Sequence, residues 1–155
     1  MPSTEPSAAP LRCAGAVIVD DDGRIFVQRR SKDRTLFPDT WDIVGGHLEP
    51  GETLEDALYR EVREETGWSV SIILGELGEH TYTGDDGLER AETDYLVRVD
   101  GDLSRPRLEA GKHTEFRWIG PEDVALLDEN RGVDDGLVRQ IAEQGFDTLR
   151  RLGLR

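Results

Sequence analysis

The sequence has one cysteine, no long apolar run and few basic residues relative to acidic ones. Because Cys13 is alone among 155 residues, no intramolecular disulfide can form, and its apolar neighbours favour an inert buried thiol. No stretch approaches the roughly 20 apolar residues of a membrane span. Residues 1–10 lack the basic and apolar regions of a signal peptide, so we expect a cytoplasmic protein.

Acidic residues outnumber basic ones by 33 to 19, which gives a net charge of -14. Duplex nucleic acid and anionic membranes bind to positive faces, so we expect neither as a partner. A protein that holds cations, or one with a solvated acidic surface, fits this charge. The length suits one domain with a real core. We expect a flexible Pro/Ser/Ala-rich tail at 1–10 and a single domain over 11–155.

Alternating and β-branched runs predict several short strands. The first two flank an Asp-Asp-Gly turn signal and predict a hairpin, and two later ones are joined through Gly-Asp-Asp-Gly. A loop between these pairs leads to a short strand that ends at Gly45 and Gly46. The expected strands cover residues 13–20, 24–30, the segment up to 46, 68–84, 92–101 and 116–119.

Three helices are expected between and after these strands. Residues 53–66 form the strongest one, with Thr53 and Asp56 as a capping pair and Gly67 as the stop. A short helix begins at Pro121. The last helix lies within 134–152, with Leu137, Ile141 and either Phe146 or Leu149 on its inner side. Hairpins mixed with helices predict an α/β fold of the α+β type, with helices on a mixed β-sheet.

The 53–66 helix turns acidic on the face that should be apolar. A wheel with about 3.6 residues per turn puts Leu54, Ala57, Leu58 and Val62 on one side. Glu61 and Glu65 fall among these residues and Glu64 lies at their edge, whereas Arg60 and Arg63 lie largely on the outer side.

Two interpretations of these glutamates stay open. Carboxylates at such spacings repel, and burying each one costs several kcal/mol without a compensating charge. A divalent cation such as Mg²⁺ supplies that charge through oxygen ligands. The alternative is a solvated acidic helix end. The helix dipole disfavours acids at its C-terminus, and the glutamates continue the core face, so the metal site is favoured.

The spacing from Gly46 through Glu52 to Arg60-Glu61-Val62-Arg63-Glu64-Glu65-Thr66-Gly67-Trp68 resembles the Nudix box of MutT-like hydrolases. The order of strands and helices over 11–150 is also similar to Nudix domains, which implies an α/β/α sandwich. Trp68 stands where an aliphatic residue is usual, and Val44 replaces a common proline.

The resemblance implies a hydrolase that uses Mg²⁺, or Mn²⁺, to cleave the pyrophosphate of a nucleoside diphosphate linked to another group. Glu61, Glu64 and Glu65 would be metal ligands, one of them also a base, and the Gly45 carbonyl would be a further ligand. Glu52 would lie outside this set. Arg60 would orient a catalytic glutamate, or form a surface ion pair with Asp56 or Glu64.

Further site residues are less constrained by the sequence. Only one of Arg29 and Arg30 can face the site, and the resemblance favours Arg30 as the phosphate contact; a pair of strand-end charges is the alternative. Trp41 and Tyr82 could stack on a base or pack in the core. An additional metal-binding acid from a loop would be Glu109 or Glu115, with Lys112 close to the expected place.

The expected substrate is a small-molecule nucleotide, first a nucleoside triphosphate, including an oxidised one of the 8-oxo-dGTP type. ADP-ribose, a nucleotide sugar or a dinucleoside polyphosphate is the alternative, although the proline that ADP-ribose enzymes carry after the box is absent from "HTYTGDDG". A non-catalytic nucleotide-binding Nudix domain is a second class, and it usually lacks some of the acids that this box retains. The number of metals stays open, as does a homodimer.

Overall fold

The computed structural model of the chain describes residues 9–154. The predicted tail at 1–10 therefore lies almost wholly outside the described residues. Within 9–154, no helix is both long enough and apolar enough to cross a membrane.

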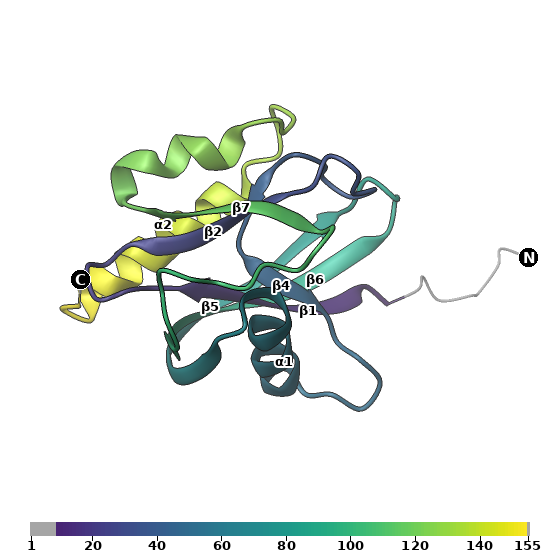
Figure 1. The fold of residues 1–155 in the computed structure, drawn as a ribbon. Helices are drawn as coiled ribbons and strands as arrows, with labels where there is room; N and C mark the ends of the chain where they lie inside the picture. Colours follow the sequence, from purple (N-terminus) through teal and green to yellow (C-terminus); the bar gives the residue numbers. More distant parts are fainter. Residues whose placement is uncertain (1–8, 155) are drawn as a thin grey trace, which may run out of the picture.

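The strands form two sheets (Figure 1). The larger sheet has four strands in the order β4-β1-β6-β5, and the smaller one has three in the order β3-β2-β7. β1 pairs with β6 in parallel and with β4 antiparallel, so the larger sheet is mixed, as the sequence predicts. The strands are β1 (Leu11–Ile18), β2 (Ile25–Arg30), β3 (Trp41–Asp42), β4 (Val44–His47), β5 (Ser69–Thr83), β6 (Glu89–Asp100) and β7 (His113–Ile119).

The predicted hairpin of the first two strands is wrong. β1 and β2 lie in different sheets, and the bridge between Val19 and Ile25 is the one pairing recorded at their junction. The reason is that β4 and β6 occupy both edges of β1, while β3 and β7 occupy both edges of β2. The Asp-Asp-Gly turn thus connects strands of two different sheets, and not two strands that pair within one sheet.

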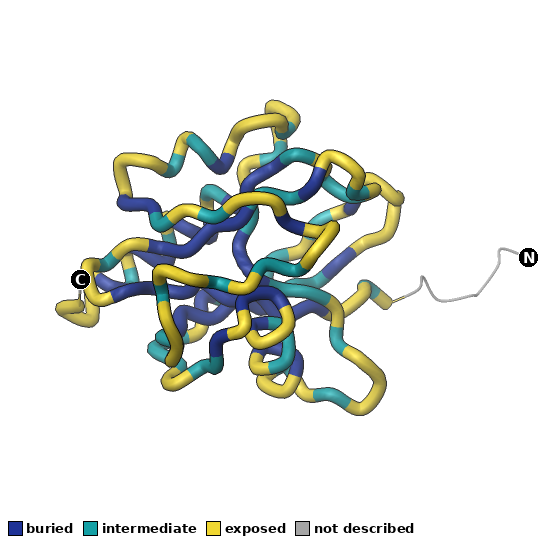
Figure 2. Tube along the Cα trace, viewed as in Figure 1, coloured by how far each residue is buried: buried dark blue, intermediate teal, exposed yellow. Residues whose placement is uncertain are grey.

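Side chains alternate along β1 into two separate cores, because successive residues of a strand point to opposite faces. Ala16 and Ile18 pack with α1 (Leu54–Thr66), and Val17 and Val19 pack with α2 (Leu137–Arg151). Figure 2 shows the buried segments gathered in the middle of the molecule. The resulting helix–sheet–helix layering confirms the predicted α/β/α arrangement.

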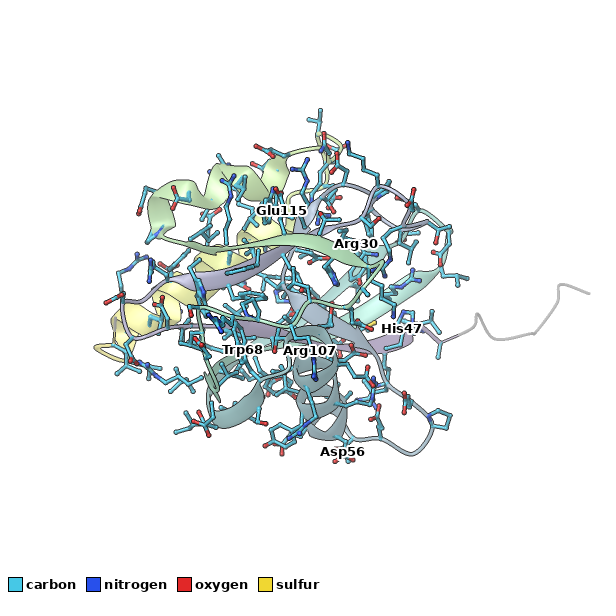
Figure 3. All side chains as sticks on the ribbon, viewed as in Figure 1. Arg30, His47, Asp56, Trp68, Arg107 and Glu115 are labelled. Carbon is cyan, nitrogen blue, oxygen red and sulfur yellow. The ribbon has the colours of Figure 1, made fainter. Side chains whose placement is uncertain are left out.

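α1 begins and ends where the sequence predicts. The Thr53 hydroxyl accepts a hydrogen bond from the Asp56 amide at 3.1 Å, and the Asp56 carboxylate accepts one from the Thr53 amide at 3.1 Å. Gly67 ends the helix with a left-handed φ of 80°, which costs a glycine little. Asp56 lies at the far end of α1 from the sheets (Figure 3), so the acidic C-terminal turn points toward them.

The other predicted elements are present, with some differences in type and length. The β5–β6 hairpin is confirmed, with its turn at residues 84–88. The helix predicted from Pro121 is a 3₁₀ helix, η1 (Pro121–Asp128), and not an α-helix. α2 buries Ile141, Phe146 and Leu149, whereas Leu137 is half-buried. β4 runs through the two glycines to His47, so the predicted end at Gly46 is one residue early.

Candidate active site

A cavity of about 690 Å³ opens between the sheets, the end of α1 and α2. Its lining changes character along its length. Acidic residues and backbone glycines from α1 and β4 form one part, and aromatic and aliphatic residues from the loops and α2 form another. The lining includes Arg30, Asp42, Gly45, Gly46, Glu61, Glu65, Tyr82, Glu92, Glu109, His113, Arg131, Val138 and Ile141.

Glu65 is buried at the inner edge of this cavity, with 5% of its surface exposed. One carboxylate oxygen accepts a hydrogen bond from the Gln28 amide nitrogen at 3.0 Å, and the other accepts one from the Gly45 amide at 2.9 Å. Burial raises the pKa of Glu65 well above its ordinary value, and the charge of Glu61 raises it further. The protein therefore fixes the position of this carboxyl but leaves its charge uncompensated.

Glu61 lies beside Glu65 and against the backbone of β4. A Cβ on Gly46 would overlap the Glu61 carboxyl, whose carbon would lie 2.7 Å away. This explains why the turn needs a glycine there. Burial raises the pKa of Glu61 as well, although its ion pair with Arg60 opposes the shift. Two neighbouring carboxylates with little exposure to water repel each other, and either a bound cation or a shared proton would relieve this repulsion.

The expectation that Arg60 points outward is wrong. Its guanidinium reaches back over the end of β4 and is only 20% exposed. It donates to both oxygens of Glu52 at 2.8 and 2.9 Å, to Glu61 at 2.9 Å and to the His47 carbonyl at 2.9 Å. It also contacts Glu64 at 3.1 Å. The long side chain folds back because four acceptors converge there, which a helical wheel does not represent.

Glu52 and Arg60 form the strongest contact of this network. The guanidinium binds the carboxylate through two parallel hydrogen bonds, a geometry that arginine favours. The hydrogen bonds from Arg60 lower the pKa of Glu52 to about 2. The sequence placed Glu52 near the loop without a partner, and the structure shows that it anchors the arginine that holds Glu61.

Glu61, Glu64 and Glu65, the three glutamates of the Nudix-like motif, do not all point into the cavity. The side chain of Glu64 is 48% exposed at the rim, whereas that of Glu61 is 13% exposed. Among the described residues, a tight group is formed instead by Glu65, Glu109 and His113, whose potential ligand atoms all lie within 4.8 Å of one another. Glu109 comes from the loop before β7. The structure therefore brings Glu109, and not Glu115, to the acidic end of the cavity.

His113 is a site neighbour that the sequence did not indicate. Its Nε2 lies 3.8 Å from a Glu65 oxygen, and its Nδ1 is buried without a hydrogen-bond partner among the described residues. Burial and the nearby charge of Arg30 lower the pKa of His113 to about 3, so the ring is neutral. A neutral imidazole beside carboxylates is a possible ligand for a divalent cation.

Arg30 lines the cavity and Arg29 does not, as the alternation of side chains along β2 predicts. Figure 3 shows Arg30 at the end of β2 that faces the loop side of the molecule. Its Nε donates to the Leu36 carbonyl at 2.9 Å. Arg29 instead pairs with Asp39 at 2.8 Å and Glu115 at 3.2 Å on the other face. Phosphate binding by Arg30 stays a prediction. Arg29 and Glu115 form an ion pair with each other outside the cavity.

Trp41 is a core residue. It is 1% exposed and is absent from the cavity lining. The guanidinium carbons of Arg29 and Arg117 lie 5.9 and 5.2 Å from the centre of its ring. This position agrees with the core-packing alternative for Trp41, and substrate contact by Trp41 stays an untested prediction. Tyr82 does line the cavity, with its ring centre 6.2 Å from that of Phe37.

Gln28 is the clearest site residue that the sequence analysis missed. It is fully buried, it follows Phe26 by two residues on the same face of β2, and it holds Glu65. Its amide oxygen is buried without a partner in the described part of the chain. A signal was present, because one polar residue interrupts the apolar run Ile-Phe-Val before two arginines.

The donor set suits a hard divalent cation. Carboxylate oxygens of Glu61 and Glu65, with Glu109 in the same cavity lining, are the ligands that Mg²⁺ and Mn²⁺ prefer. The raised pKa values of the two buried glutamates reflect a charge cost that a cation would remove. Gly45 contacts Glu65 through its amide, and metal binding by its carbonyl stays a prediction.

The α/β/α sandwich thus places glutamates of one helix at a cavity, in an arrangement that suits a divalent cation. The model of the NUDIX domain matches residues 9–141, and the chain belongs to the Nudix family. It is thus a Nudix pyrophosphohydrolase of the MutT-like kind.

Individual relatives agree with this assignment. The nucleoside triphosphatase NudI of Escherichia coli (strain ATCC 8739) is 34% identical over 123 residues, which cover 73% of this chain and 84% of NudI. The crystal structure of a MutT NUDIX hydrolase from Burkholderia pseudomallei has a TM-score of 0.72 at 27% identity, covering 88% of this chain and 98% of that one. A NUDIX hydrolase from Nitrosomonas europaea has a TM-score of 0.71 at 25% identity, covering 95% and 92%.

Proposed function

We propose that the chain hydrolyses the pyrophosphate bond of nucleoside triphosphates with the help of Mg²⁺ or Mn²⁺. The observation that carries the proposal is the buried Glu65 beside the half-buried Glu61, against the Gly45–Gly46 backbone, at one end of the cavity. The relative NudI is a nucleoside triphosphatase, which supports the triphosphate as the substrate class. Oxidised triphosphates of the 8-oxo-dGTP type belong to that class and are the finer prediction.

Glu61, Glu64 and Glu65 would hold the cation, with the Gly45 carbonyl as a further ligand. When bound, the cation supplies positive charge that orients the diphosphate and acidifies the attacking water. Gln28 and the Gly45 amide keep Glu65 in place through their hydrogen bonds. Arg60 does the same for Glu61, and Glu52 restrains Arg60 from the other side.

The remaining steps use groups at the rim of the cavity. Arg30 would bind phosphate oxygens through the guanidinium nitrogens that Leu36 leaves free. Glu64 is the glutamate that we assign as the base. Its side chain is 48% exposed to water, whereas both oxygens of Glu65 already accept hydrogen bonds. It would take a proton from the water that attacks phosphorus, while the phosphate leaving group departs.

The test is hydrolysis of a nucleotide panel by the wild type and by Glu61→Gln, Glu64→Gln and Glu55→Gln. Glu55 is exposed on the same helix and serves as the matched control. The panel holds common and oxidised triphosphates, ADP-ribose and a dinucleoside polyphosphate, with products identified by ³¹P NMR. We expect triphosphate turnover that EDTA abolishes, a loss of about 10²-fold or more in kcat for the first two variants, and no loss for the control.

Two outcomes would contradict the proposal. Preferred turnover of ADP-ribose or of a dinucleoside polyphosphate would replace the triphosphate. Tight nucleotide binding with no turnover of any panel member would assign the chain to the non-catalytic class.

A further inference from the structure

A second pair of carboxyl groups lies in the cavity, away from the Nudix box. Glu92 and Asp94 are two residues apart on β6, so their side chains share one face. In the sheet, Glu92 lies between Cys13 of β1 and His80 of β5. Glu92 lines the cavity, whereas Asp94 is fully buried beneath it.

Asp94 is held by a hydrogen-bonded chain that ends on α2. Its Oδ2 lies 2.9 Å from His80 Nδ1, and His80 Nε2 lies 3.0 Å from Gln144 Oε1. The His80 side chain is only 10% exposed. The lower carboxyl of the pair is therefore fixed to two layers of the fold and is not free to reach a ligand.

The two carboxyl groups meet over Gly15. A Cβ on Gly15 would overlap Asp94 Oδ1 and would lie 3.1 Å from Glu92 Oε2. Only a residue without a side chain leaves room for both groups on this face of β1. Asp94 Oδ1 is buried without a hydrogen-bond partner among the described residues, and Glu92 Oε2 approaches the same point over Gly15, so a protonated Glu92 could donate to it.

The remaining oxygen of Glu92 is the functional one. Burial raises the pKa of Glu92 and the charge of Asp94 raises it further, which is consistent with a neutral Glu92 that donates to Asp94. Apart from the contact with Asp94, the Glu92 side chain has no hydrogen-bond partner within residues 9–154, and the residue is half-buried in a cavity wall. Glu92 Oε1 thus presents a fixed acceptor to whatever fills the cavity.

The place of Glu92 indicates which part of a nucleotide it meets. Asp42 lines the same cavity as Glu65 and Glu92, so the Nudix glutamates and the second pair face one space. Tyr82 feels the charge of Glu92, and the α2 side chains Val138 and Ile141 line the same cavity. A nucleotide whose phosphates bind at the Nudix glutamates would place its base against these cavity-lining side chains and Glu92.

We propose that Glu92 recognises the nucleobase: its free carboxyl oxygen accepts a hydrogen bond from an amino or imino N–H on the edge of the base, while Asp94 and His80 hold it in position. This inference rests on the proposed nucleotide hydrolysis and deepens it by assigning a residue that determines base specificity. A carboxyl fixed in this way favours bases that carry an N–H donor, because a base without one would leave the Glu92 oxygen without a hydrogen bond.

The test compares Glu92→Ala, Glu92→Gln and Glu89→Ala with the wild type. Glu89 is an exposed acid on the same strand and is absent from the cavity lining, so it is the matched control. The substrates are the four common nucleoside triphosphates, purine riboside triphosphate, whose base carries no N–H donor, and inorganic tripolyphosphate. KM and kcat are measured with Mg²⁺, and the Kd of a non-hydrolysable methylene analogue of the best substrate is measured by calorimetry.

For Glu92→Ala we expect KM and Kd for the best nucleotide to rise about fivefold to tenfold, with kcat unchanged. Purine riboside triphosphate and tripolyphosphate should be unaffected. Glu92→Gln keeps an acceptor oxygen and should stay within about twofold of the wild type, as should the control. Circular dichroism melting checks that each variant folds.

Three results would overturn the inference while leaving the hydrolase intact. The first is an unchanged base preference in Glu92→Ala. The second is an equal rise in KM with purine riboside triphosphate, which would indicate a ribose contact. The third is an equal rise in KM with tripolyphosphate, which would indicate a phosphate or metal role. If the wild type neither hydrolyses nor binds any nucleotide, the proposed function fails and the inference fails with it. If the wild type binds without turnover, the Kd values alone decide on Glu92.

Discussion

Replacing Glu65 by glutamine should stabilise the metal-free protein. Glu65 is 5% exposed and lies beside the second buried carboxyl of Glu61, so at neutral pH the fold carries the cost of a buried charge. Glutamine fits the same space and can still accept from the Gly45 amide. Its new NH₂ group would face the Gln28 amide, but that amide can flip, because its own oxygen has no partner among the described residues.

The sign and size of this effect follow from the raised pKa of Glu65. The folded protein binds this proton more tightly than the unfolded chain, whose glutamates have pKa values near 4.5. The stability that this group contributes is therefore present below pH 4.5 and is lost as the pH rises toward the folded pKa. Burying a carboxylate costs several kcal/mol, and after its two hydrogen bonds offset part of this, about 1–3 kcal/mol remains near pH 7. For a chain of this length that corresponds to roughly 3–10 °C in Tm.

The assay is thermal unfolding of the wild type, Glu65→Gln and the exposed control Glu55→Gln in EDTA between pH 5 and pH 8. Glu65→Gln should melt higher than the wild type in EDTA, with a gap that grows with pH, and the control should not. Adding Mg²⁺ should raise the Tm of the wild type and change that of Glu65→Gln little, because only the wild type keeps the charged ligand. A Glu65→Gln protein that melts lower than the wild type in EDTA at pH 8 would refute this reasoning.

Three further changes test other parts of the site. Arg60→Ala should lower kcat by about 10²-fold, because Glu61 loses its anchor, and Arg60→Lys should recover only part of it in the same kinetic assay. Gly46→Ala should weaken Mn²⁺ binding about tenfold or more, as measured by electron paramagnetic resonance, because its Cβ overlaps the Glu61 carboxyl; an unchanged affinity would exclude Glu61 as a ligand. Glu109→Gln should weaken Mn²⁺ binding while Glu115→Gln should not, and the reverse order would contradict the observed placement of these two acids.

The acidic helix could be predicted from sequence because its signals are local. Its cap at Thr53, its stop at Gly67 and the apolar stripe that Glu61 and Glu65 continue all lie within the helix or at its two ends. Local hydrogen bonds and helical periodicity determine such features, and both are visible in a short window of sequence.

Features that depend on distant partners were missed or wrong. The direction of Arg60 depends on the His47 carbonyl and on Glu52, which lies before the helix. The split between β1 and β2 depends on which strands occupy their edges, and the burial of Trp41 depends on core residues from β1, β2 and α2. Sequence patterns report how a segment alternates but not which segment it meets.

The most direct test of the account is anomalous diffraction from a crystal of the wild-type protein soaked in Mn²⁺ with a non-hydrolysable triphosphate analogue. The account predicts an anomalous peak in contact with carboxylate oxygens of both Glu61 and Glu65, with phosphate oxygens on its open side. Ordered phosphates elsewhere in the cavity, with no manganese touching these two side chains, would contradict it.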